Sequence, residues 1–200
     1  MGSFFTRLVV TIVLSAIAAA AYVYFQTGDP IYALRESLNG GAWARYDRAI
    51  KKAAADNQID PRLIKAVVWR ESRFGAHKKG AHGERGLMQI TEIAAKDYAI
   101  AKGIKDFDPN ELFKPEVNLE VGSWYLKRAL DHYKDRESPL PFALSEYNAG
   151  RSRVTKWIGN PEKEIPTSAE EMKQKSYDST RAYVEAIEQR YEFYKQRGEM

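Results

Sequence analysis

After residue 42, proline and glycine divide the chain into segments whose apolar residues recur at helical spacing. In one of them Asp60 supplies an N-cap carboxylate and Pro61 the first helical position, which predicts a helix ending near Ser72. No apolar stretch alternates over enough residues to form a core strand, so the sequence predicts an all-α globular domain. The other helices are expected at 42–55, 91–103, 117–133, 139–150, 154–158 and 177–196. A loop is expected at 80–86, turns at 108–109 and 114–115, and a polar loop with a helical turn at 164–174.

The residues from Leu8 to Phe25 carry no charge. As a helix, this run reaches roughly 27 Å, which is just enough to cross the hydrocarbon core of a bilayer. Arg7 precedes the run and Asp29 follows it, so the positive-inside rule places the rest of the chain outside the cytoplasm. We expect residues 1–27 to form one transmembrane helix of the inner membrane, with the remaining chain in the periplasm. A signal peptide cleaved near Ala18, Ala19 and Ala20 is the alternative, and it would export the same domain.

Composition narrows the classes of function. The formal net charge of +4 is spread over many Lys and Arg residues, and no nucleic-acid motif accompanies it. The chain has no cysteine, which excludes disulfides, a thiolate nucleophile and a cysteine-containing zinc site. Its three histidines lack zinc-ligand spacing. We therefore expect no metal, no cofactor and no nucleic-acid partner, with a tether and first soluble helix at 28–58 and the main domain at 59–200.

Glu71 lies four residues after Val67, so helical spacing places its carboxylate on the apolar face of the expected helix. Burial disfavours the ionised form and raises the pKa of a carboxyl group, as a general acid working near neutral pH requires. The structural alternative is a carboxylate paired with Arg70, Arg73 or Arg85.

Three short motifs follow one another along the chain. They are Glu71-Ser72-Arg73-Phe74, Gly86-Leu87-Met88-Gln89 and Tyr147-Asn148-Ala149-Gly150. Each motif is weak alone, but their order, their spacing and their positions at helix ends resemble the catalytic domain of the soluble lytic transglycosylases. This family is the goose-lysozyme-like branch of the lysozyme superfamily. The resemblance covers roughly residues 59–159, with a fainter continuation through 180–184.

The resemblance implies a lysozyme-like domain with an open groove for peptidoglycan glycan strands. Glu71 occupies the position of the family's single catalytic glutamate, which protonates the leaving oxygen and then deprotonates the 6-hydroxyl of N-acetylmuramic acid, closing a 1,6-anhydro ring. The substrate's 2-acetamido group takes the stabilising role that a second carboxylate has in two-acid glycosidases. The resemblance also implies substrate-binding roles for Ser72, Gly86, Met88, Gln89, Tyr147 and Asn148.

The sequence departs from the family pattern at three positions. Thr91 and Glu92 stand where Met-Pro is common, Glu146 replaces a frequent alanine, and Ser179 replaces an acid found in some relatives. A Glu146 carboxylate facing the groove would permit activation of water. Two alternatives therefore stay open: a hydrolytic muramidase, and a catalytically silent peptidoglycan-binding scaffold for cell-wall or secretion machinery.

Overall fold

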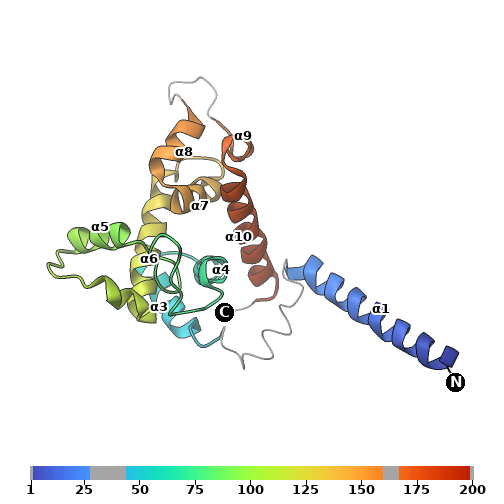
Figure 1. The fold of residues 1–200 in the computed structure, drawn as a ribbon. Coiled ribbons are helices and arrows are strands. Elements are labelled where there is room, and N and C mark those ends of the chain that lie inside the picture. The colour runs from blue at the N-terminus through green and yellow to red at the C-terminus, as the bar shows by residue number, and fades with distance from the viewer. Residues whose placement is uncertain (1, 28–43, 160–166, 199–200) are drawn as a thin grey trace.

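The computed structural model describes residues 2–27, 44–159 and 167–198. Outside its helices, this part of the chain contains two isolated β-bridges, Lys79 with Arg85 and Arg85 with Ile90, and no strand. The all-α prediction is therefore confirmed. The helices are α1 (Gly2–Thr27), α3 (Asp47–Asn57), α4 (Pro61–Ser72), α5 (Glu92–Lys102), the 3₁₀ helix η1 (Pro109–Phe113), α6 (Pro115–His132), α7 (Pro139–Ala149), α8 (Arg151–Ile158), α9 (Ala169–Lys175) and α10 (Asp178–Gln196) (Figure 1).

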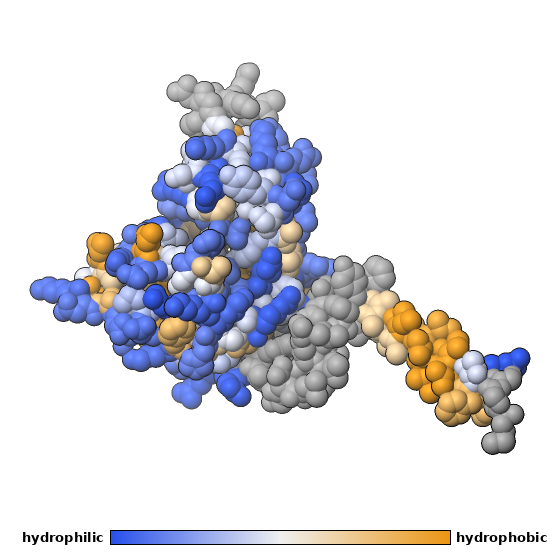
Figure 2. Space-filling view, in the orientation of Figure 1, coloured by the Kyte–Doolittle hydropathy of each residue, from blue (hydrophilic) through white to orange (hydrophobic). Residues whose placement is uncertain are grey.

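Helix α1 is the one helix of the described residues that is long and apolar enough to cross a membrane, from Phe4 to Tyr22. None of these residues is buried, and they form the apolar rod at the right of Figure 2. A membrane anchor and a signal sequence share these properties, because both are apolar helices near an amino terminus. The predicted tether at 28–43 lies outside the described residues.

Helix α4 lies between α3 and α10 at the centre of the domain (Figure 1). It begins as the sequence predicts, since the Asp60 side chain accepts a hydrogen bond from the backbone N–H of Arg62 at 2.9 Å and Pro61 follows the cap. The hydroxyl of Tyr191 in α10 donates to the same carboxylate at 2.9 Å, which fastens α10 to the start of α4. The buried residues of α4 are Leu63, Ile64, Lys65, Ala66, Val67, Val68, Trp69 and Ser72.

Arg190 of α10 is buried against α4. Its guanidinium carbon lies 3.9 Å from the centroid of the Trp69 ring and 5.1 Å from that of Phe193. Cation–π contacts of this kind stabilise a charge that has left water. Tyr183 is seven residues before Arg190, so both side chains lie on the same face of α10. The packing that holds Arg190 therefore also turns Tyr183 toward α4.

Three local predictions differ from the structure. The first soluble helix begins at Asp47, later than expected, and ends at Asn57. A loop with one helical turn was expected at 164–174, of which residues 164–166 lie outside the described residues. From Ala169 the chain instead forms the seven-residue helix α9, which is capped by Ser168 and anchored by the fully buried Met172. A single buried residue produces no apolar stripe, so its sequence resembles that of a loop. The turn expected at 108–109 continues as the 3₁₀ helix η1.

Candidate active site

Glu71 lies in the last turn of α4 and is half-buried. The hydroxyl of Tyr183 donates a hydrogen bond to its Oε1 at 2.7 Å. Burial raises the pKa of Glu71 from an ordinary value near 4.5 to about 7, although the Tyr183 hydrogen bond and the charges of Arg70 and Lys78 oppose the rise. A carboxyl group with this pKa can both give and take a proton near neutral pH.

The three arginines that could have paired with Glu71 lie against other groups. The guanidinium groups of Arg70 and Arg73 lie over aromatic rings, 5.3 Å and 3.6 Å from the ring centroids. Arg85 lies 4.0 Å from the carboxylate of Glu92. Within the described parts of the chain, no cation forms an ion pair with Glu71. Burial, and not ion pairing, therefore governs the protonation of this carboxyl group.

The chain turns sharply directly after Glu71. Arg73 and Phe74 both have left-handed backbone conformations, with φ of 53° and 63°, which are costly for residues other than glycine. The turn is held by burial of the Phe74 ring and by Lys78, whose Nζ donates a hydrogen bond to the backbone carbonyl of Glu71. This reversal leaves the Glu71 side chain at the edge of a cleft.

The cleft has a volume of about 510 Å³. Four residues with predicted roles line it, namely Glu71, Gln89, Tyr147 and Asn148. Ser72, Gly86 and Met88 do not line it. The other lining residues are Arg70, Lys78, Lys79, Gly80, Ala81, Glu84 and Thr91.

Tyr147 and Asn148, at the end of α7, form one wall of the cleft. The Tyr147 hydroxyl donates to the backbone carbonyl of Met88 at 3.0 Å. Burial raises the pKa of Tyr147 well above its usual value, and the nearby Glu71 charge adds to the rise, so the phenol stays protonated. The Asn148 Oδ1 accepts a hydrogen bond from the Thr180 hydroxyl at 2.9 Å, which orients the amide N–H groups for a ligand.

Gln89 holds the segment 78–89, which forms another wall of the cleft. Its backbone is left-handed, with φ of 49°, and its Nε2 donates to the carbonyls of Gly86 at 2.9 Å and Lys78 at 3.2 Å. These bonds use the amide nitrogen and leave the amide oxygen as the group that can meet a donor in the cleft. Gln89 thus combines a structural role with a position on the cleft surface.

Gly86 and Met88 are buried and support this wall from behind. Gly86 has φ of +78°, and a Cβ there would lie 2.3 Å from both the Asn118 Nδ2 and the carbonyl of Leu112. Met88 is fully buried, and its backbone N–H donates to Asn118 Oδ1 at 2.7 Å. The backbone packs so closely against α6 and the carbonyl of Leu112 that only glycine fits at this position.

Ser72 is buried, and its hydroxyl donates to the carbonyl of Val68 at 3.2 Å within α4. The three departures from the family pattern also have defined places. Thr91 lines the cleft, but its Oγ1 accepts from the backbone N–H of Ala94 and caps α5. Glu146 is buried away from the cleft, and Ser179 is exposed on α10.

Glu146 is held in its buried position by two hydrogen bonds. It accepts one from the Tyr133 hydroxyl at 2.8 Å, and its other oxygen lies 2.8 Å from Nδ1 of His132. Nη1 of Arg151 lies 3.1 Å from the other ring nitrogen of this histidine. The carboxylate therefore belongs to a structural network of α6, α7 and α8. Glu146 does not line the cleft, so it is not placed to activate a water molecule there.

Two residues of the site, Tyr183 and Glu84, were not predicted from the sequence. Tyr183 lies in the faint continuation at 180–184, but its contact with Glu71 joins residues 112 positions apart. Glu84 lies in the expected loop, and its Oε2 accepts from the backbone N–H of His82 at 3.0 Å. Glu84 lines the same cleft as Glu71, and its negative charge adds to the rise in the pKa of Glu71. The cleft therefore contains a second carboxylate.

Among the residues that the structure describes, no cluster of three or more His, Asp or Glu side chains could hold a metal ion. The reactive group of this cleft is a carboxyl group of raised pKa, with a tyrosine hydroxyl hydrogen-bonded to it. Such an arrangement suits proton transfer to and from a bound polar substrate.

Solved structures share this fold. The lytic transglycosylase Slt of Pseudomonas aeruginosa matches with a TM-score of 0.69 at 21% identity, over 92% of this chain and 30% of that one. The 70-kDa soluble lytic transglycosylase of Escherichia coli matches with a TM-score of 0.69 at 24% identity, over 90% of this chain and 30% of that one. These likenesses confirm the predicted lysozyme-like helical fold.

Sequence relatives point the same way. The membrane-bound lytic murein transglycosylase F of Desulfosudis oleivorans is 32% identical over 55% of this chain and 23% of its own length. The soluble lytic murein transglycosylase of Salmonella typhimurium is 28% identical over 71% of this chain and 22% of its own. The chain thus spans less than a quarter of the length of these relatives. The model of the transglycosylase SLT domain matches residues 48–168, more than half of the chain. The chain therefore belongs to the transglycosylase SLT domain family.

Proposed function

We propose that this domain is a peptidoglycan lytic transglycosylase that cleaves between N-acetylmuramic acid and N-acetylglucosamine. The observation that carries the proposal is the half-buried Glu71, whose pKa of about 7 leaves about half of its carboxyl groups protonated at pH 7. A single group can then serve as acid and as base within one catalytic cycle. Membership of the SLT family and the names of the relatives support the choice of substrate.

In the first step, protonated Glu71 gives its proton to the glycosidic oxygen, and the bond from that oxygen to C1 of muramic acid breaks. The Glu71 carboxylate then takes the proton of the 6-hydroxyl, whose oxygen bonds to C1 and closes the 1,6-anhydro ring. Glu71 ends protonated, and no water is consumed. The Tyr183 hydroxyl stabilises the carboxylate between the two steps, because a hydrogen bond to a charged acceptor is stronger than one to a neutral acceptor.

Tyr183 does not itself transfer a proton in this proposal. Burial and the neighbouring Glu71 raise the pKa of its phenol well above the usual value. The phenol therefore stays protonated and acts as a hydrogen-bond donor. Among the residues with predicted binding roles, we assign substrate contacts to Gln89, Tyr147 and Asn148, which line the cleft. We assign Ser72, Gly86 and Met88 to the support of these walls.

We further propose that α1 anchors the domain to the inner membrane as a single crossing, with the cleft in the periplasm. The apolar run from Phe4 to Tyr22 supports this placement, as do the names of membrane-bound relatives. An anchored enzyme reaches only the glycan strands near the membrane surface. Detection of the uncleaved amino-terminal segment in isolated membranes tests the anchor against an exported, processed domain.

Product analysis tests the proposed reaction. Mass spectrometry of murein digested by the full chain should show 1,6-anhydromuramic ends, and Glu71→Gln should produce none. Hydrolysis is the second candidate function, favoured by the Glu84 carboxylate in the same cleft. Digestion in ¹⁸O-labelled water distinguishes the two, because hydrolysis places the label on a new reducing end and ring closure does not. Labelled reducing ends would therefore replace our proposal with a muramidase.

The silent scaffold predicts a third result. In that case the unaltered chain and Glu71→Gln would sediment equally well with murein sacculi, and neither would release soluble fragments. A transglycosylase instead loses fragment release with Glu71→Gln and keeps binding, because the amide has nearly the shape of the carboxyl group.

A further inference from the structure

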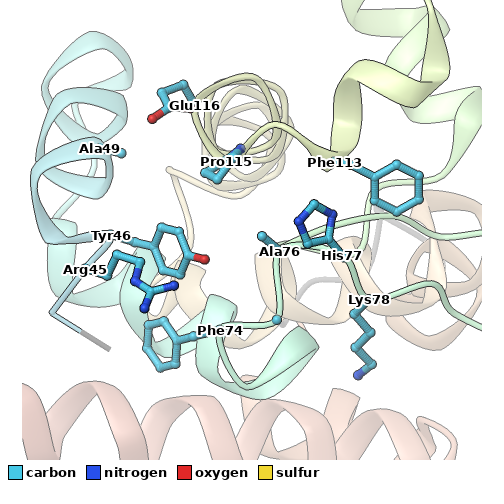
Figure 3. A pocket seen from close by; sticks show the side chains of 11 residues that line it. Arg45, Tyr46, Ala49, Phe74, Ala76, His77, Lys78, Phe113, Pro115 and Glu116 are labelled. Carbon is cyan, nitrogen blue, oxygen red and sulfur yellow. The ribbon is translucent and has the colours of Figure 1, made fainter. Parts of the chain in front are cut away.

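Large apolar side chains of the globular part are almost all buried, at least in part. Even around the second cavity, of about 750 Å³, Tyr46 and Phe113 are partly buried and Phe74 is buried (Figure 3). In the described ranges 44–159 and 167–198, the exposed large apolar side chains are Ile93, Ile100, Ile104 and Tyr177. The three isoleucines belong to α5 and to the turn directly after it, and we call them the isoleucine stripe.

The isoleucine stripe faces outward from α5. Ile100 is seven residues after Ile93, which is about two helical turns, so both side chains lie on the same face. Their side chains are 74% and 79% exposed, and Ile104, beyond the end of the helix, is 42% exposed. Figure 2 shows apolar surface gathered over α5, at the left of the view. The stripe is therefore open to a partner outside the domain.

The inward face of α5 is made mostly of smaller residues. Ala94, Ala95 and Ala99 are buried there together with Tyr98, where α5 packs on α6. Packing on α6 alone would favour the opposite arrangement, because burying an isoleucine removes more apolar surface from water than burying an alanine. The largest aliphatic side chains of α5 thus contribute little to the core of the domain.

Lysines border the isoleucine stripe. Lys96 lies between Ile93 and Ile100 along the helix, and Lys102 and Lys105 lie at its end, all three exposed. An apolar stripe bordered by lysines is typical of a helix that lies in the surface of an anionic bilayer. The apolar side chains of such a helix enter the lipid, and its ammonium groups meet the lipid phosphates.

The carboxylates of this segment leave positive charge at the end of α5. Glu92 pairs with Lys96 at 2.9 Å, and Asp97 lies 3.9 Å from Arg128 of α6. Asp106 then stands against the two lysines at the end of the helix, which form no ion pair with another residue of the described segments. The end of α5 therefore carries a net positive charge, which complements an anionic lipid surface.

The chain itself brings a bilayer close to α5. The proposed anchor α1 ends at Thr27, and the described part of the domain begins at residue 44. The chain between them spans at most about 60 Å. The domain thus stays within this distance of the bilayer, so the lipid surface is the apolar phase that the stripe meets at a high effective concentration.

We propose that the isoleucine stripe docks on the anionic lipid surface of the membrane that holds α1. This inference rests on the anchoring by α1 proposed above. Helix α5 begins directly after Thr91, which lines the catalytic cleft. A docked α5 holds this end of the cleft close to the lipid headgroups, and the domain is thereby directed to the glycan strands nearest the bilayer.

Fluorescence quenching in vesicles tests the docking. The chain has no cysteine, so Ile100→Cys provides a single thiol for an environment-sensitive fluorophore on the full chain. The labelled chain is reconstituted into vesicles of phosphatidylethanolamine and phosphatidylglycerol with brominated acyl chains. The emission should shift to the blue and be quenched. Bromine near the carboxyl end of the acyl chain should quench most strongly, because such helices enter a bilayer by only about 5–10 Å.

A second label tests whether the stripe itself causes the docking. In a chain labelled at Ile104→Cys, the double change Ile93→Gln with Ile100→Gln should abolish the quenching, since glutamine keeps helix propensity and removes the apolar surface. Tyr177→Gln is the matched control in the same labelled chain. It removes the fourth exposed large apolar side chain, which lies outside α5, and should leave the quenching unchanged.

Flotation of the vesicles separates failure of the anchor from failure of the docking. A chain that does not float with the vesicles would overturn the anchor, and this inference with it. A floating chain whose label at position 100 stays unquenched would overturn the docking alone, and so would quenching that survives the double change. A blue shift without quenching by the lipid would also overturn it, because the stripe would then be covered by protein, such as a second copy of the chain.

Discussion

Replacing Glu71 by glutamine should stabilise the fold, and the gain should grow with pH. The pKa of Glu71 is about 7 in the folded protein and near 4.5 in an exposed chain. Below pH 4.5 the carboxyl group is protonated in both the folded and the unfolded state, so its ionisation does not change the free energy of unfolding. As the pH rises from 4.5 to 7, the unfolded state ionises more readily than the folded one, and stability is lost. Glutamine has no proton to lose, so the variant escapes this cost.

The size of the effect follows from the pKa. A rise of about 2.5 pH units corresponds to about 3 kcal/mol, and contact of the side chain with the open cleft reduces our expectation to about 2 kcal/mol above pH 7. For a domain of this size that free energy raises Tm by about 6 °C. Thermal unfolding followed by circular dichroism at pH 4 and pH 8 measures it, with Glu137→Gln as an exposed control that should show no pH-dependent difference.

We expect nearly equal Tm values for Glu71→Gln and the unaltered chain at pH 4, and a clear gap at pH 8. A gap that is the same at both pH values would refute it, because a constant difference reflects packing and not ionisation. A variant that is less stable than the unaltered chain at pH 8 would show that the carboxylate is well solvated. In that case the proposed acid has no raised pKa.

Three further predictions concern the surroundings of Glu71. Tyr183→Phe removes a hydrogen bond to the carboxylate, so the pKa of Glu71 rises by about one pH unit further and the pH profile of kcat/KM moves upward; an unchanged profile would contradict the assigned donor. Glu84→Gln removes a negative charge from the cleft, so the same profile should move to lower pH, and an upward movement would count against this electrostatic coupling. Gly86→Ala places a Cβ 2.3 Å from the Asn118 amide nitrogen at a residue of positive φ. A denaturant titration should show that the free energy of unfolding falls by about 3 kcal/mol, and a loss below about 1 kcal/mol would mean that the loop relaxes freely.

The sequence predicted the parts of the site that depend on local spacing. The Asp60-Pro61 start fixes the phase of α4, and that phase places Glu71 on the buried face of its helix. The motif around Tyr147 and Asn148 ends α7, so both side chains lie where the helix meets the cleft. Helix periodicity and helix-end signals are patterns among residues close together in the chain, so they can be recognised in a single sequence.

Other parts depend on contacts between distant segments, which spacing does not encode. The hydrogen bond from Tyr183 to Glu71 requires the packing of α10 on α4, and the carbonyl and amide contacts of Asn118 require the loop to dock on α6. The direction in which the Glu146 side chain points could not be predicted from its neighbours in the sequence either. Six consecutive residues of α7, from Pro141 to Glu146, are buried, so the helix has no polar face against which to orient one side chain.

The placement of the three departures bears on whether the domain is an enzyme. A silent scaffold was motivated by Thr91, Glu146 and Ser179, which differ from the family pattern. The structure gives Thr91 a helix-capping bond, buries Glu146 with Tyr133, and leaves Ser179 exposed. In the described part of the chain, no hydrogen bond or ion pair joins the side chain of Thr91, Glu146 or Ser179 to Glu71. Besides burial, the groups that act on the pKa of Glu71 are Tyr183, Arg70, Lys78 and Glu84, and none of the three departures is among them. The departures therefore leave the proposed acid in place and give no structural reason to prefer the silent scaffold.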